Sequence, residues 1–335
     1  MTNNYAQARE RIGLYDQSGK TGRVIGRGKD VIDLLHRMST NDLKPIEHKP
    51  FAGAQTVLTN EKGRIVDLIT VLNRGNDALL LTSKDHEETI IKWLDKFTIM
   101  DDARFERASE QLSQFLLIGR GAYGFVSELI GIDPSSLARF SAVEVEYFGA
   151  KLLVQKSVRI AESGWTFIVD VEKANEIFRQ LQEEISLLGG VVLDEETYEA
   201  LRIETGIPAS PNELNEKHNP LEAALVTAVS FTKGCYIGQE VIARLDSYDK
   251  VQRHLLGVRL NAMPRAALPI PITLREGEVV GELTSCQFSP GLDCVIGLAY
   301  IKTSYSNPGA QFYVNDGDQQ LSATLEKLPF ELELA

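Results

Sequence analysis

The segment from Lys233 to Arg244 carries the strongest chemical signal in the chain. Two glycines flank Cys235 in this segment, and a helical pattern begins near Gln239. A cysteine just before a helix N-terminus faces the positive end of the helix dipole, and Lys233 and Arg244 add positive charge. This setting favours the reactive thiolate. Because free cysteines are often simply buried, a small thiol packed in a tight turn is the alternative.

Four further residues carry a carboxylate or an amide in positions that could bind a ligand. Asp67 lies among apolar residues of a predicted strand, where it either acts on a ligand or pairs with a neighbour such as Arg64. Glu204 falls at the end of a helical pattern, where glutamate is usually solvated. Asn41 and Asp42 form part of a Thr-Asn-Asp turn and either line a cavity or cap and turn the chain.

Helices and strands alternate through the part of the chain that must position these groups. Hydrophobic periodicity predicts α+β layers, in which strands pack against helices. Asp85 is the predicted cap of the second helix. The predicted helices are 30–38, 85–97 and 171–188, and the predicted strands are 51–59, 64–72, 78–82, 114–118, 151–155 and 165–170.

The glycine-rich run at 119–124 has the spacing of a dinucleotide-binding fingerprint. It follows a strand pattern, but no acidic ribose partner stands about 20 residues further on. We therefore predict a turn. Beyond residue 253, short apolar runs alternate with turn signals such as Asn307-Pro-Gly309, and helical periodicity nearly disappears. Short apolar runs separated by turns are typical of a small β-barrel or sandwich. We therefore predict a domain boundary near residue 250.

Composition narrows the class of protein. The chain has 335 residues and a formal net charge of −12, which argues against non-specific nucleic-acid binding. It has no apolar run of about 20 residues and no apolar signal-peptide core, so we expect a cytoplasmic protein without a membrane partner. The few cysteines fit a reducing compartment, and Cys286 and Cys294 are predicted to be core or surface filler. No HExxH occurs, so we expect no metal ligands.

The sequence is identified by its motifs as a member of the glycine-cleavage T-protein superfamily. Residues 233–240 resemble the K-G-C-[YF]-x-G-Q-E hallmark of its folate-binding YgfZ branch. The resemblance covers nearly the whole chain, and it implies an α/β body around a central cavity at 1–250, with possible subdomains 1–110 and 111–250, and a C-terminal β-barrel at 251–335. Further segments that resemble family signatures are 13–16, 39–42, 63–67, 281–285, 289–290 and 296–300.

The resemblance also implies a folate site. Arg202-Ile-Glu204-Thr-Gly206 resembles the family's R-x-E-x-G segment, whose glutamate holds the pterin ring. A carboxylate can accept a ring N–H and the adjacent amino group together, as it does from an arginine fork. The remaining expected contacts with tetrahydrofolate, or with a one-carbon derivative of it, are Asn41, Arg202, Lys233, Tyr236, Gln239 and Arg244.

The predicted catalytic groups are Cys235 and Asp67. T-proteins resemble G-G-x-x-D-D-L near the reactive folate nitrogens, whereas only one aspartate, Asp67, stands here. The segment at 164–167 lacks the acidic, glycine-rich part of the family's G-x-T-G-E-x-G loop. T-proteins also generally lack a cysteine at position 235. These departures weaken the case for aminomethyl transfer.

Two functions follow from the resemblance. The first is a folate-binding accessory protein for the maturation or repair of iron–sulfur proteins, with iron–sulfur client or assembly proteins as partners. The alternative is a tetrahydrofolate-dependent aminomethyltransferase, whose partner would be a lipoyl carrier protein. A folate-dependent demethylase fits this length poorly, because those modules are usually fused to an oxidase.

Overall fold

The computed structural model describes residues 2–160, 163–247, 250–317 and 319–331. These residues fall into two compact units. One unit comprises Asn3–Leu193 together with Thr227–Gln239, and the other comprises Thr2, Asp194–Val226 and the chain from Glu240 onward. The chain therefore returns to its first unit for a short segment before it completes the second.

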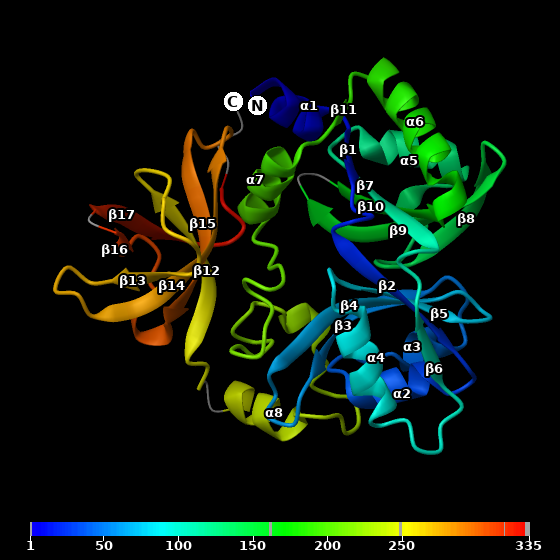
Figure 1. Ribbon diagram of the computed structural model, residues 1–335, viewed down its shortest axis with the longest axis horizontal. Helices are drawn as coiled ribbons and strands as arrows, with labels where there is room; N and C mark the ends of the chain where they lie inside the picture. The colour runs from blue at the N-terminus through cyan, green and yellow to red at the C-terminus, as the bar shows by residue number, and fades with distance from the viewer. Residues whose placement is uncertain (1, 161–162, 248–249, 318, 332–335) are drawn as a thin grey trace. The chain divides into compact units, whose positions relative to one another are not determined.

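A six-stranded sheet forms one half of the first unit. Its strand order is β11-β1-β7-β10-β9-β8, and its central strand β7 is buried along its whole length. Helices α5 and α6 lie along one face of this sheet (Figure 1), where their apolar stripes build one core cluster. The elements are α1 Thr2–Glu10, β1 Gly13–Asp16, β7 Leu112–Ile118, α5 Ala122–Ile130, β8 Ala142–Tyr147, β9 Ala150–Ile160, β10 Ser163–Asp170, α6 Val171–Leu187 and β11 Val191–Val192.

A five-stranded sheet of order β3-β4-β5-β2-β6 forms the other half of the first unit. Helix α2 buries its entire apolar stripe against this sheet, as the periodicity of residues 30–38 predicts. The elements are β2 Thr21–Arg27, α2 Val31–Met38, α3 Lys44–Glu47, β3 Gly53–Thr59, β4 Ile65–Asn73, β5 Ala78–Ser83, α4 Glu87–Asp95 and β6 Arg104–Arg107.

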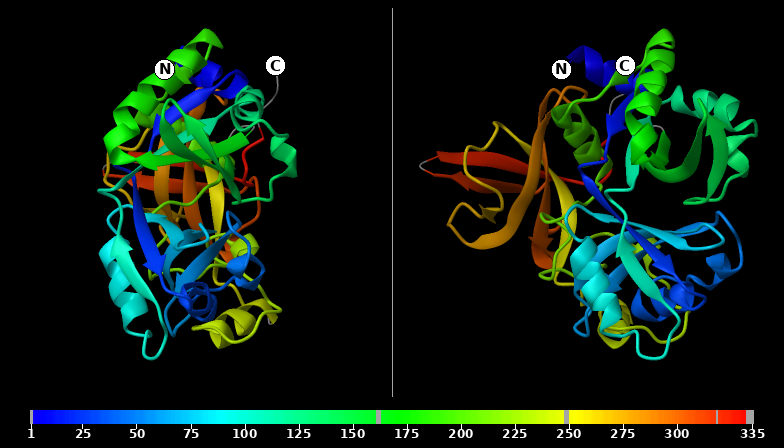
Figure 2. Two further views of the ribbon diagram at one scale, coloured as in Figure 1. Left: turned by 90° about the vertical axis from the view of Figure 1, so that its right-hand side faces the viewer. Right: turned by 45° about the vertical axis from the view of Figure 1, so that its right-hand side comes forward.

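The second unit is built around a closed six-stranded barrel of order β12-β15-β14-β13-β16-β17, coloured yellow to red in Figures 1 and 2. Helix α7 packs against β14 and β15. Helix α8 links the two units along the chain. The elements are α7 Glu195–Thr205, α8 Gln239–Ser247, β12 Arg253–Leu260, β13 Ile270–Thr273, β14 Val279–Ser289, β15 Cys294–Lys302, β16 Gln311–Asp316 and β17 Gln319–Glu326.

This architecture confirms the predicted fold class, a mixed α/β body followed by a β-barrel. Asp85 is not the cap of α4, because His86 occupies the N-cap position and Asp85 adopts a left-handed φ of 59° before it. The glycine-rich run does turn at Gly119, whose φ is +96°, but it then continues directly into α5. The boundary near 250 and the subdomain division at 110 stay predictions.

None of the helices in the described part of the chain is both long enough and apolar enough to cross a membrane.

The core of the six-stranded sheet yields a direct test of the packing. Leu117 on β7 has no exposed surface, whereas Leu187 at the end of α6 is 87% exposed. Leu117→Ala removes buried methyl groups and leaves a cavity, so it should lower the free energy of unfolding by about 2–5 kcal/mol. The matched change Leu187→Ala should cost less than about 0.5 kcal/mol. Urea denaturation of both variants measures this; equal losses would contradict the packing.

Candidate functional site

Residues 227–239 return to the five-stranded half of the first unit and are anchored there at both ends. Thr40 donates from its hydroxyl to the carbonyl of Ala228 at 2.6 Å, and the Ser230 amide donates to the Thr40 carbonyl at 2.9 Å. At the far end, the hydroxyl of Thr59 donates to the carbonyl of Ile237 at 2.7 Å. The intervening loop, Ser230–Gly238, carries the cysteine motif and is therefore held in place.

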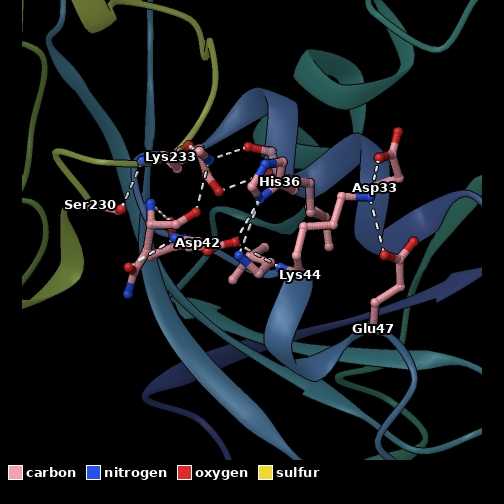
Figure 3. Close-up of polar contacts among 12 residues, drawn as sticks. Asp33, His36, Asp42, Lys44, Glu47, Ser230 and Lys233 are labelled. Carbon is pink, nitrogen blue, oxygen red and sulfur yellow. Dashed lines mark hydrogen bonds and ion pairs between the residues drawn. The ribbon is translucent and has the colours of Figure 1, made fainter.

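Lys233 ties the middle of this loop to the end of α2, as Figure 3 shows. Its Nζ donates to the carbonyls of Ser39 and Asn41, each at 2.8 Å, and to the carbonyl of His36. A lysine ammonium has three donors, so all are used here. The carbonyls at a helix C-terminus lack intrahelical partners and attract cations. Burial lowers the pKa of Lys233 to about 8, while the charge of Asp42 opposes this shift.

Cys235 is an exposed free thiol in the same loop. The neighbouring Tyr236 is buried, with Lys233 Nζ 5.1 Å from the centre of its ring, and burial raises the pKa of Tyr236 to about 12. Helix α8 begins at Gln239, as predicted. The exposed Arg244 on α8 belongs to the other compact unit. The tight-turn alternative, with a buried thiol, does not match the exposure of Cys235.

Asn41 is engaged in the turn itself. Its side-chain amide donates to the carbonyl of Gln55 at 2.8 Å, and its side-chain oxygen accepts from the Asp42 amide at 2.9 Å. His36 accepts from the Leu43 amide through Nδ1, and burial, followed by the charge of Lys233, lowers the pKa of His36. These bonds give the Thr-Asn-Asp turn a structural role.

Asp67 is fully buried on β4, where its carboxylate meets the end of β5. Its oxygens accept from the Ser83 amide at 2.9 Å and from the Ser83 hydroxyl at 2.5 Å, and also from the Leu68 amide. The Nδ1 atom of His86 lies 3.7 Å from Asp67 Oδ2. Hydrogen bonding to Asp67, partly offset by burial, raises the pKa of His86. The sequence indicates neither Ser83 nor His86, because both lie on the next strand–helix connection.

Arg202 organises a buried polar cluster in the second unit. Its guanidinium forms a fork with Glu199, with N–O distances of 2.7 to 3.1 Å, and donates to the carbonyl of Ile207 at 2.6 Å and to the Ser285 hydroxyl at 3.0 Å. Ser285 in turn donates to Glu213 at 2.7 Å. Arg202 therefore holds α7 and the chain after it against β14.

Glu204 is 2% exposed, so it is not the solvated side chain that its sequence context alone suggests. Its carboxylate accepts from the Ser289 hydroxyl at 2.5 Å, and its backbone carbonyl accepts from the Phe330 amide at 2.8 Å. Residues 285 and 289 stand among the segments that resemble the family barrel, but their partnership with α7 has no local sequence signature.

The structure thus distributes the predicted residues over four places, one of which is α8 with Gln239 and Arg244. Asn41, Lys233, Cys235 and Tyr236 lie together on or beside the Ser230–Gly238 loop. Asp67 lies elsewhere in the same unit, where its carboxylate accepts a hydrogen bond from the Ser83 hydroxyl. Arg202 and Glu204 lie on α7 in the other unit. Within the described residues, no cluster of His, Cys, Asp and Glu is arranged to hold a metal ion.

Two buried polar atoms in the first unit offer further capacity for a polar ligand. Gln155 on β9 is fully buried and donates to the carbonyl of Phe140 at 2.9 Å. In the described part of the chain, its Oε1 atom has no hydrogen-bond partner, and neither has the hydroxyl of Ser157 two residues further on. Because side chains alternate along a strand, both face the same side of the sheet.

Family profiles and similar proteins both relate this chain to the glycine cleavage T-protein family. The profile of the GCVT N-terminal domain matches residues 1–233, and that of the glycine cleavage T-protein C-terminal barrel domain matches residues 253–330. The protein named "Probable aminomethyltransferase" from Thermococcus gammatolerans is 28% identical over 96% of this chain and 87% of its own length. The "Aminomethyltransferase" of Geobacillus kaustophilus is also 28% identical, over 96% and 88%.

A solved structure supports the fold. The crystal structure of glycine cleavage system aminomethyltransferase T from Bartonella henselae superposes with a TM-score of 0.83 over 98% of this chain and 89% of that chain. Its sequence identity is 18%, so this likeness concerns the fold alone.

The Asp67–His86 pair predicts a pH dependence of stability. Because Asp67 raises the pKa of His86 in the folded state, the pair stabilises fully below the unfolded value of about 6.5 and loses this contribution as pH rises through the folded value. The difference in unfolding free energy between wild type and His86→Gln should therefore be larger near about pH 5.5 than near about pH 8.5.

Urea denaturation at both pH values measures this difference. The matched control is His48→Gln, because the His48 side chain is 90% exposed. If His86→Gln changes the unfolding free energy by the same amount at both pH values, the Asp67–His86 ion pair does not contribute to stability.

Proposed function

Because the chain belongs to the glycine cleavage T-protein family, we propose that it binds tetrahydrofolate or a one-carbon derivative and acts on it as an aminomethyltransferase does. The main support for this proposal is that the profiles of both family domains match this one chain. Relatives that cover nearly its whole length bear the name aminomethyltransferase. In such a reaction, tetrahydrofolate accepts a carbon unit from an aminomethyl group on a lipoyl carrier protein.

Glu204 is the residue that we assign to the pterin ring. Its place in the R-x-E-x-G pattern supports this assignment, as does its burial, since a carboxylate shielded from water forms stronger hydrogen bonds. A carboxylate has about four lone-pair positions, so accepting from Ser289 still permits it to accept from a ligand. We assign to Ser289 the positioning of this carboxylate.

Asp67 takes a positioning role in this proposal. Its oxygens already accept from Ser83 and Leu68, and His86 lies beside it. A carboxylate in this environment orients its neighbours and supplies negative charge, whereas direct proton abstraction would require it to give up these bonds. The half-buried His86 is the group through which Asp67 would act.

A second candidate is the accessory role in iron–sulfur protein maturation or repair, with client or assembly proteins as partners. The specific observation in its favour is the exposed thiol of Cys235 on a loop that Lys233 and Thr59 hold in place. A thiol that must meet another protein has to be accessible, and this one is. Folate binding through Glu204 is common to both candidates.

Folate binding is the first test. Glu204→Gln keeps the size of the side chain but removes the charge that pairs with two ligand donors, so it should weaken tetrahydrofolate binding by about 2–4 kcal/mol. Calorimetric titration measures the affinity, and Glu183→Gln on the exposed face of α6 is the matched control. Equal affinities for Glu204→Gln and wild type, with both proteins folded, would exclude Glu204 from the site.

The two candidates differ in which residue matters for turnover. With purified protein, aminomethyl-loaded lipoyl carrier and tetrahydrofolate, the leading proposal predicts ammonia release that Asp67→Asn reduces by at least about tenfold and Cys235→Ser leaves unchanged. Ammonia release over time is the measurement.

If folate binds but no ammonia is released, aminomethyl transfer is wrong. The accessory candidate then predicts that Cys235→Ser keeps the melting temperature and folate affinity but fails to restore iron–sulfur enzyme activity in a strain that lacks the gene.

A further inference from the structure

The imidazole of His218 is buried in the second unit without a hydrogen bond of ordinary length. Its side chain is 1% exposed, and in the described part of the chain neither Nδ1 nor Nε2 has a hydrogen-bond partner. Two carboxylates face these atoms instead: Glu222 Oε2 lies 3.9 Å from Nδ1, and Glu282 Oε1 lies 3.6 Å from Nε2. Because buried polar groups normally form hydrogen bonds, this arrangement requires a physical explanation.

Both carboxylates are held in position by other contacts. Glu222 is 4% exposed, and its Oε2 accepts from the Asn219 amide at 3.1 Å. Glu282 stands opposite Tyr300 in the register of β14 and β15, so their two side chains lie on the same face of the barrel wall. The imidazole therefore meets one acidic group from its own segment and one from β14.

The charge state of the ring decides whether these contacts attract or repel. A neutral imidazole has one donor nitrogen and one acceptor nitrogen. Whichever tautomer forms, a lone pair of His218 faces a carboxylate and the two repel each other. A protonated ring presents an N–H to each side and attracts both Glu222 and Glu282. The imidazolium alone matches the groups on both sides.

Tyr300 on β15 is a third contact that favours a cation. Its ring is stacked on His218, with 3.5 Å between the ring centres and 8° between the planes. Burial, followed by the charges of three nearby glutamates, raises the pKa of Tyr300, so the phenol stays neutral. A neutral aromatic ring offers the negative face of its π system to a cation.

The nearby cations act mainly on Glu282. The interaction with His218 lowers the pKa of Glu282, and burial opposes this shift. Arg253 Nη1 lies 3.5 Å from Glu282 Oε1, but the Arg253 side chain is 42% exposed, so solvent screens its charge. Lys217 is also exposed. The charged and titratable groups around His218 are Lys217 and Glu222 from its own segment, Arg253 from β12, Glu282 from β14 and Tyr300 from β15.

The segment that carries this histidine, residues 207–226, follows α7 along the chain and is attached to the barrel on either side of the imidazole. The Tyr300 hydroxyl donates to the Glu213 carbonyl at 2.8 Å, and the Leu255 amide donates to the Glu222 carbonyl at 2.9 Å. A charged imidazole between these two points adds a third attachment, which depends on a proton.

From this arrangement we infer that His218 is carried as an imidazolium and acts as a proton-dependent lock, which fastens segment 207–226 to Glu282 on β14. Glu222 completes the pair of carboxylates that holds the proton. Glu282 also connects the ring to solvent, because it is 22% exposed and lines a cavity of about 150 Å³. Loss of the proton turns a lone pair towards a carboxylate, so the chain that follows Glu204 on α7 is held less firmly at high pH.

Histidine NMR of the full chain measures the charge of the ring. With histidine labelled at Cε1 and His218→Gln to assign the signal, His218 should titrate at least about one pH unit above the exposed His48. Glu282→Gln should reduce this difference, whereas Glu276→Gln, an exposed glutamate in the turn before β14, should leave it unchanged. A smaller difference in the wild-type chain, or no effect of Glu282→Gln, contradicts the inference.

Hydrogen exchange of the Leu255 amide tests the lock itself. A difference of one pH unit in titration corresponds to a tenfold change in the equilibrium between the held and the released segment. After correction for intrinsic exchange, protection of this amide should therefore fall about tenfold as His218 loses its proton. In His218→Gln the protection should not change over the same pH range. Constant protection in the wild-type chain overturns the lock, even if the ring is charged. Neither measurement involves folate or turnover.

Discussion

The ammonium group of Lys233 fixes the loop on which the cysteine motif stands. Three backbone carbonyls, those of His36, Ser39 and Asn41, receive its three donors at the end of α2. These bonds place a cation close to a helix C-terminus, and they join the middle of the loop to a segment nearly 200 residues earlier, beside the bonds that Thr40 makes with residues 228 and 230. Cys235 and Tyr236 follow in this anchored loop, the first exposed and the second buried beside the same ammonium group.

The sequence predicts the elements well where periodicity is strong, and less well where tertiary contacts decide. The stripe of α2 and the long amphipathic helix at 171–188 correspond closely to observed helices, because burial of one face requires their spacing. The predicted helix start at residue 85 is wrong, because α4 begins at Glu87 and Asp85 takes a left-handed conformation that composition does not reveal. The sequence predicts Lys233 as a source of charge near Cys235 and as a folate contact; in the structure its ammonium group donates to three backbone carbonyls, which a sequence does not reveal.

In the candidate site, the sequence likewise indicates the residue types but not their surroundings. The family pattern singles out Asp67 and Glu204, but it does not indicate that Ser83 and His86 surround the first or that Ser289 contacts the second. Those partners come from other strands, and only the fold brings them near. Their presence changes the chemistry, because a carboxylate that already accepts several hydrogen bonds acts mainly by orienting its neighbours.

The Ser230–Gly238 loop and helix α7 place their functional groups in opposite environments, one exposed to solvent and the other shielded from it. A group that orients a pterin ring has to be shielded from water, since solvent competes for its hydrogen bonds, and Glu204 is buried. A thiol that reacts with another molecule has to be reachable, and Cys235 is exposed. Each requirement is met by a separate set of contacts, the Ser289 bond for one and the Lys233 bonds for the other. A member of this family could consequently lose or gain chemistry at the cysteine loop while the buried carboxylate on α7, which we propose for the pterin ring, stays unchanged.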